Sequence, residues 1–285
     1  MRITILFCLS VVLAAPLWAD ERPQRIVVAD GALTEILFAL GAEDRIVGVD
    51  TTSIYPAVAQ SLPNVGYLRA LSAEGILSLQ PDLLLTTQDA GPTAVLNQLQ
   101  QAGLPIAQLD VEYSSVGTLA LIKQVGELVG MPAEALTLAH QVEAQIDAVA
   151  QQLPPDIRIM FVLNAGGRGF MVSGLDTRSN ALIELVGASN AFTEFPGYKP
   201  LTNEAALMAA PDVILVSHAE GALEGVMQHP ALVMTPAVAN GRVYSLDHTD
   251  WLQFGPRLGD AVAELTALLL APSRNTDQAL AQETP

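Results

Sequence analysis

The chain has 285 residues, of which 51% are hydrophobic and 15% are charged. Its 30 acidic residues outnumber its 13 basic ones, so the formal net charge of −17 argues against binding to nucleic acid or anionic membranes. A chain of this length and apolar content can form one large domain or two moderate ones.

The first nineteen residues predict export from the cytoplasm. Arg2 provides a short basic region, residues 3–16 are almost wholly apolar, and the small residue Ala19 ends the segment, as in a secretory signal peptide. The apolar run is shorter than the roughly 20 residues of a membrane-spanning helix. Cleavage removes Arg2 and no acid, which takes the charge from −17 to −18, and it also removes Cys8, the one cysteine. We therefore expect a periplasmic protein without disulfides and without membrane insertion.

The segment after the leader has the alternating pattern of a parallel α/β sheet. Short β-branched or leucine-rich runs predict strands at 25–29, 46–49, 83–86 and 106–109. A helical pattern lies between the first two strands and stops at Gly41. Continuous apolar strands separated by helices are typical of sheets that are covered on both faces.

A longer helical region divides the chain. The pattern from Thr118 to Leu153 is broken only at residues 130–132, where glycine closes one helix and proline opens the next. Further strands are expected at 158–163, 213–216 and 243–245. We predict an α/β fold of two lobes with central, mainly parallel sheets, joined by one long helix, with a ligand cleft between the lobes. The N-terminal lobe is 20–131, the linking helix 132–153, the C-terminal lobe 154–272, and 273–285 is a disordered tail.

An internal repeat supports two related lobes. Residues 71–85 align with residues 201–215 at a constant offset, with Leu, Glu, Leu, Pro, Asp and Leu at matching places. Ser72 and Thr202 are candidate N-caps of helices that carry Glu74 and Glu204 in their first turns. In both copies Pro-Asp then leads the chain into a strand. Chance recurrence of a common helix-turn-strand unit is the alternative.

Taken in order, these features resemble the haem-specific branch of ABC-importer binding proteins, whose lobes are joined by one long helix. The likeness covers essentially all of the mature chain. Its most specific part is Gly66–Leu77, where haem binders place an iron-ligating tyrosine just before a Ser-x-Glu-Gly helix. A second part is Phe254-Gly255-Pro256-Arg257. Residues with the second-lobe pattern of this branch are Gly174, Thr177, Ala181, Leu185, Gly187, Ala188 and Asn190.

The resemblance implies that Tyr67 is the axial ligand of the haem iron. A phenolate is a hard anionic oxygen suited to ferric iron and is a known protein ligand of haem. A cation such as Arg69 or Arg257 favours the charged form of a phenol. An ordinary loop tyrosine with a solvated hydroxyl is the alternative for Tyr67.

Arginines are the natural partners of the two haem propionates. We expect Arg168 and Arg257 of the second lobe in this role. Arg168 could instead be a solvent-facing turn residue, and Arg257 could instead stabilise a helix start after Pro256. Trp251 and Phe254 are candidates to stack on the porphyrin, and Tyr198 is a candidate to line the cleft.

Glu74 and Glu204 carry a second implication of the resemblance. Related importers use one exposed glutamate on each lobe to meet arginines of the permease. An acid in the first turn of a helix also stabilises the helix dipole, and both roles are compatible.

No enzyme is expected. The sequence has neither a Gly-x-Ser-x-Gly elbow nor a phosphate-loop or dinucleotide fingerprint. The predicted function is delivery of haem b, as a transported ligand and not a catalytic cofactor, by a periplasmic monomer to an ABC permease and its ATPase. Because fold does not determine the ligand, a cobalamin or ferric-siderophore binder is the alternative.

Overall fold

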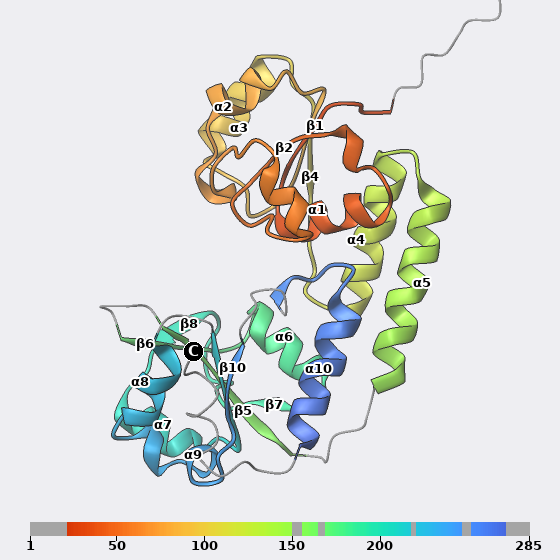
Figure 1. Ribbon diagram of the computed structural model, residues 1–285. Helices are drawn as coiled ribbons and strands as arrows, with labels where there is room; N and C mark the ends of the chain where they lie inside the picture. The colour runs from red at the N-terminus through yellow and green to blue at the C-terminus, as the bar shows by residue number, and fades with distance from the viewer. Residues whose placement is uncertain (1–21, 150–155, 165–168, 218–220, 247–251, 272–285) are drawn as a thin grey trace, which may run out of the picture.

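The chain forms two α/β lobes with helices α4 (Ser115–Leu128) and α5 (Pro132–Val149) along one side (Figure 1). The computed structural model describes residues 22–149, 156–164, 169–217, 221–246 and 252–271. The predicted leader and the predicted C-terminal tail lie outside these residues. Within them, no helix is long and apolar enough to span a bilayer.

The N-terminal lobe contains a four-stranded parallel sheet. Its strands are β1 (Ile26–Ala29), β2 (Ile46–Val49), β3 (Leu83–Thr87) and β4 (Ile106–Leu109), in the order β2-β1-β3-β4. Strands β1 and β3 are buried throughout, which explains the apolar sequence of β1 and the run of three leucines that begins β3. All four predicted strands are confirmed. The accompanying helices are α1 (Gly31–Ala39), α2 (Ala73–Ser78) and α3 (Thr93–Gln101).

Helix α5 connects the lobes. It begins at Pro132, as its sequence predicts, and it is described as far as Val149; residues 150–153 of the predicted helix lie outside the described part. It packs against α4 and, farther along, against α10 (Leu258–Leu270) of the second lobe (Figure 1). Buried residues of all three helices belong to one apolar cluster that continues into both sheets. The lobes are therefore joined by a shared core as well as by the covalent link.

The C-terminal lobe contains a mixed sheet in the order β10-β9-β5-β6-β8. The predicted strands are β5 (Arg158–Asn164), β9 (Val213–Ser217) and β10 (Val243–Leu246), which are parallel. Strands β6 (Phe170–Ser173) and β8 (Tyr198–Pro200) add an antiparallel edge that the sequence pattern did not reveal, and β7 (Ser189–Asn190) pairs with β5. The exposed, three-residue β8 is too short to produce a clear apolar alternation. The helices are α6 (Arg178–Leu185), α7 (Asn203–Ala209), α8 (Ala222–Gln228) and α9 (Pro236–Ala239).

The internal repeat corresponds to equivalent structure in the two lobes. The hydroxyls of Ser72 and Thr202 cap α2 and α7 by accepting backbone N–H bonds. The carboxylate of Asp82 accepts the backbone N–H of Arg25 at 3.0 Å, and that of Asp212 accepts the backbone N–H of Arg158 at 2.9 Å. Each repeat thus carries its own helix cap and its own bond to the neighbouring strand.

Candidate functional site: a cleft between the lobes

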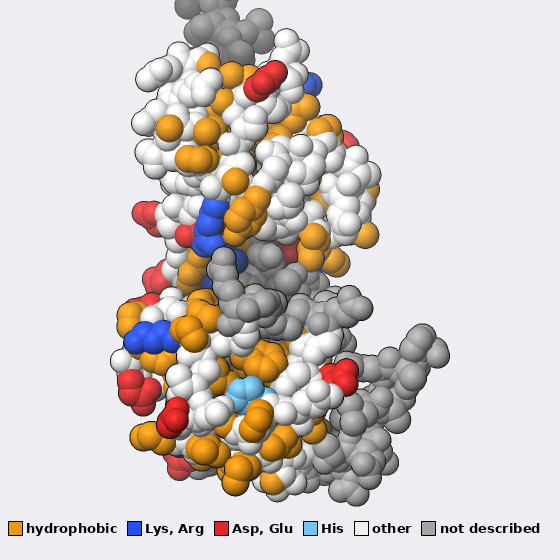
Figure 2. Space-filling model, turned by 90° about the vertical axis from the view of Figure 1, so that its left-hand side faces the viewer, with side chains coloured by type: hydrophobic (Ala, Val, Ile, Leu, Met, Phe, Trp, Pro, Cys, Tyr) orange, Lys and Arg blue, Asp and Glu red, His pale blue; other side chains and the backbone are white. Residues whose placement is uncertain are grey.

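A cavity of about 550 Å³ lies between the lobes, within the usual size of small-molecule sites. The N-terminal lobe contributes residues that follow the carboxyl ends of its strands, where parallel sheets generally bind ligands. Basic side chains gather near this junction on the face seen in Figure 2. The described lining residues are Asp30, Thr52, Tyr67, Leu68, Arg69, Asp89, Tyr113, Asp176, Thr177, Arg178, Gly197, Tyr198 and Gln253.

The segment around Tyr67 is held at the mouth of this cavity by backbone hydrogen bonds. Gly66 has a φ of 98°, which L side chains rarely adopt, and its carbonyl accepts the N–H of Thr51. Leu68 is buried, and its carbonyl accepts the N–H of Gly91 in the loop after β3. The ring of Tyr67 remains 42% exposed. The glycine predicted to precede the ligand therefore allows the turn that leaves the phenol accessible.

A chain of polar contacts starts at Tyr67. Arg69 Nη1 lies 3.3 Å from the Tyr67 hydroxyl, and Arg69 Nη2 lies 2.9 Å from Asp89 Oδ2. Partial burial lowers the pKa of the Arg69 guanidinium, but Asp89 and Tyr67 outweigh that effect and hold this pKa above its usual value. The structure thus brings Tyr67 and Arg69 together, as the sequence predicts for a cation beside the phenol.

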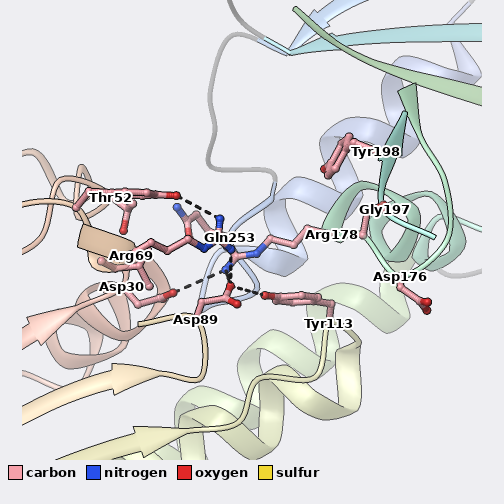
Figure 3. Close-up of a pocket in the computed structure, with 13 residues that line it drawn as sticks. Asp30, Thr52, Arg69, Asp89, Tyr113, Asp176, Arg178, Gly197, Tyr198 and Gln253 are labelled. Atoms are coloured by element: carbon pink, nitrogen blue, oxygen red, sulfur yellow. Dashed lines mark hydrogen bonds and ion pairs between the residues drawn. The ribbon is translucent and has the colours of Figure 1, made fainter. Parts of the chain in front are cut away.

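Arg178 is a cleft residue that the sequence analysis missed. It lies at the start of α6 and reaches across the cleft, where its Nη2 is 3.8 Å from both Asp30 Oδ2 and Asp89 Oδ2 (Figure 3). Its guanidinium also lies over the Tyr113 ring, 4.8 Å from the centroid. A cation in the first turn of a helix opposes the dipole, and that local conflict was the available signal.

Asp30 connects this cation to the N-terminal sheet. It follows β1, caps α1 by accepting the backbone N–H groups of Ala32 and Leu33, and is 2% exposed. Burial raises its pKa, against the opposing effects of Arg178 and the two backbone N–H groups. The Arg178 contact therefore reaches a desolvated carboxylate of the opposite lobe.

The side chain of Arg257 is paired with other residues of the protein, and Arg257 is not among the described residues that line the cavity. Its Nη2 and Nε donate to Glu35 Oε1 and Oε2, and its guanidinium stacks 3.7 Å from the centroid of the Tyr55 ring. It occupies the N-cap position of α10, but its side chain makes no capping hydrogen bond there. The suggestion that Phe254 stacks on a ligand is wrong for its observed position, because this ring is buried and packs against Tyr113.

The other residues predicted for the site are divided among the undescribed segments, the exposed helix starts and the cavity. Arg168 and Trp251 lie outside the described residues. Glu74 and Glu204 are exposed in the first turns of α2 and α7, one on each lobe. Tyr198 lines the cavity from the C-terminal side, across from Arg69 and Asp89 (Figure 3).

Residues 26–249 match the family model described as periplasmic binding protein. The chain belongs to this family. Members bind substrates for transport, so this periplasmic binding protein works outside the cytoplasm as the partner of an ABC transporter.

Three proteins similar to this periplasmic binding protein differ in the ligands that their names give. The heme-binding protein RhuT from Roseiflexus sp. RS-1 superposes with a TM-score of 0.82 at 37% identity, over 86% of this chain and 97% of RhuT. The ABC transporter substrate-binding lipoprotein YvrC of Bacillus subtilis is 26% identical over 86% of this chain and 79% of YvrC. A vitamin B12-binding protein of Vibrio campbellii is 24% identical over 86% of this chain and 89% of its own length.

Proposed function

We propose that this protein captures haem in the cleft between its lobes and delivers it to an inner-membrane ABC importer. The observation that carries the proposal is the position of Tyr67, an accessible phenol at the cavity with Arg69 at its hydroxyl. The similarity to a heme-binding protein at 37% identity supports the same ligand. Haem is here the cargo, and transport energy comes from the ATPase of the importer.

Tyr67 is the proposed ligand of the ferric iron, through its phenolate oxygen. Arg69 donates to that oxygen and stabilises its negative charge. Because one protein ligand on an exposed segment holds the iron, few bonds have to break when the cargo leaves.

Cations around the cleft are the proposed partners of the two propionates. Arg178 is added to this group because it lines the cavity and is 26% exposed. Arg168 remains a proposed partner. For Arg257 the same role requires that it bind the ligand from beside the cavity while it is paired with Glu35.

Docking to the permease is proposed for Glu74 and Glu204. Their exposure at equivalent places on the two lobes suits arginines of a partner that bridges both lobes. We further propose a periplasmic monomer with a leader of residues 1–19 that is cleaved off, an N-terminal lobe of 20–131 and a C-terminal lobe of 154–272.

A haemin titration of the mature protein and of Tyr67→Phe tests the proposal. The native protein is expected to give a saturable absorption spectrum with high-spin tyrosinate character, which Tyr67→Phe loses. Tyr55→Phe is the matched control, since Tyr55 lies on the same lobe at a similar exposure but is not among the described lining residues. A native protein that gives no saturable change, or a Tyr67→Phe spectrum identical to the native one, contradicts the proposal.

Cobalamin is the second candidate, because of the vitamin B12-binding relative. Its cobalt is already coordinated by the corrin, so it needs no protein phenolate. Saturable binding of cyanocobalamin that survives Tyr67→Phe would favour this candidate over haem.

A further inference from the structure

Two guanidinium groups of the cleft, one from each lobe, converge on the same carboxylate. Asp89 Oδ2 lies 2.9 Å from Arg69 Nη2 and 3.8 Å from Arg178 Nη2. The Tyr113 hydroxyl donates to the same oxygen over 3.3 Å. Figure 3 shows these side chains pointing toward one another at one end of the cavity. An anionic group of the protein therefore occupies the point at which both cations are directed.

We propose that Asp89 competes with the carboxylates of the bound ligand for Arg69 and Arg178, and thereby limits the affinity of the cleft. The inference rests on the proposed function, because haem carries two propionates. A guanidinium bound to Asp89 offers a ligand carboxylate the same type of hydrogen bond that it already makes. The incoming carboxylate must displace Asp89 or share its partners, and it is repelled by the Asp89 charge in both cases.

The charges of the described lining support this competition. Its carboxylates are Asp30, Asp89 and Asp176, and its guanidinium groups are Arg69 and Arg178. The two positive charges of this lining are thus fully balanced by carboxylates of the protein itself. Asp89 and Arg178 are each 26% exposed, and Arg69 is 57% exposed, so a ligand can reach all three. Such compensation suits a protein that must release an anionic cargo to its importer.

The charge can be removed with little change in shape. Asp89→Asn keeps an oxygen that accepts from Arg69 and Tyr113. Asp176→Asn is the matched control, because it also removes one lining carboxylate, but one whose side chain points away from Asp89 (Figure 3). Asp89→Glu keeps the charge and tests whether a change of side chain alone has an effect.

Titration with haemin and with haemin dimethyl ester, in the same detergent-containing buffer, separates competition from positioning. Asp89→Asn is expected to bind haemin about fivefold more tightly, which is the scale of one partly exposed charge pair, and to bind the ester unchanged. Asp176→Asn and Asp89→Glu are expected to change haemin affinity by less than about twofold.

Other outcomes overturn the inference. No gain for haemin, an equal gain for both ligands, or an equal gain in Asp89→Glu excludes competition by the Asp89 charge. Weaker binding of both ligands by Asp89→Asn assigns Asp89 to holding Arg69 against Tyr67 instead. In each of these cases haemin binding by the native protein leaves the proposed function intact, whereas a native protein that does not bind haemin removes both proposals.

Discussion

Arg257 and Glu35 form a two-point ion pair between the lobes, with Nη2 2.6 Å from Oε1 and Nε 3.0 Å from Oε2. The side chain of Glu35 is 4% exposed, and that of Arg257 is 22% exposed. The stacked Tyr55 ring covers the guanidinium. This ion pair links the start of α10 to α1 and so contributes to the relative position of the two lobes.

Replacement of Arg257 by methionine is expected to lower the free energy of unfolding by about 3 kcal/mol, because a buried carboxylate loses a two-point partner. Urea unfolding followed by circular dichroism measures the loss. Arg69→Met is the control, since it breaks an exposed pair and should cost less than about 1 kcal/mol. Equal losses in the two variants would refute the importance of burial for the Glu35 pair. A haemin titration of Arg257→Met also tests the ligand role predicted for this residue.

Arg178→Gln is expected to weaken haemin binding about tenfold, as for loss of one hydrogen bond to a charged group. The dimethyl ester of haemin should bind with unchanged affinity, because it lacks the carboxylates that Arg178 is proposed to meet. Lys199→Gln is the matched control: this cation of the same lobe lies over Phe195 and is not among the described lining residues. A similar decrease for the ester would mean that Arg178 acts through the shape of the cleft.

Glu74→Lys and Glu204→Lys are expected to leave haemin affinity unchanged and to lower stimulation of the importer ATPase at least about tenfold each, since like charges then oppose each other at the docking site. The measurement uses the permease and its ATPase in proteoliposomes. Glu224→Lys is the control, because Glu224 is also an exposed acid in the first turn of a C-terminal-lobe helix. Normal stimulation by both variants would remove the docking role.

Asp30→Asn is expected to alter the dependence of stability on pH. Burial raises the pKa of Asp30 in the folded protein above its usual 3.8, so the folded state holds this proton more tightly than the unfolded state. The contribution of Asp30 to the stability of the native protein consequently falls as pH rises from about 3.8 through the raised pKa, and this decrease levels off above it. The asparagine still caps α1 but does not titrate.

Urea unfolding of both proteins across that pH range measures the difference. The stability of Asp30→Asn relative to the native protein should increase with pH and then become constant. A difference that decreases as pH rises would show that Arg178 and the backbone N–H groups outweigh burial and hold the pKa of Asp30 below its usual value.

Local features of this protein follow from its sequence. Strands β1, β3, β5 and β9 each contain a continuous apolar run, and short-range hydrogen bonding makes Ser72 and Thr202 N-caps. Both kinds of signal act within a few residues. Tyr67 was selected differently, because residues 66–77 resemble the segment in which haem binders place their iron-ligating tyrosine. The short antiparallel strands β6 and β8 carry a weaker signal, because their pairing depends on each other and on β5.

Only the tertiary structure decided how the charged groups are paired. Arg257 meets Glu35 across 222 positions of the chain, so no local pattern connects them. Asp89 and Arg178 follow different strands in different lobes and become neighbours only when the shared core of α4, α5 and α10 brings the lobes together. Burial and electrostatic partners are properties of the assembled cleft, and they determine which arginines can meet a ligand.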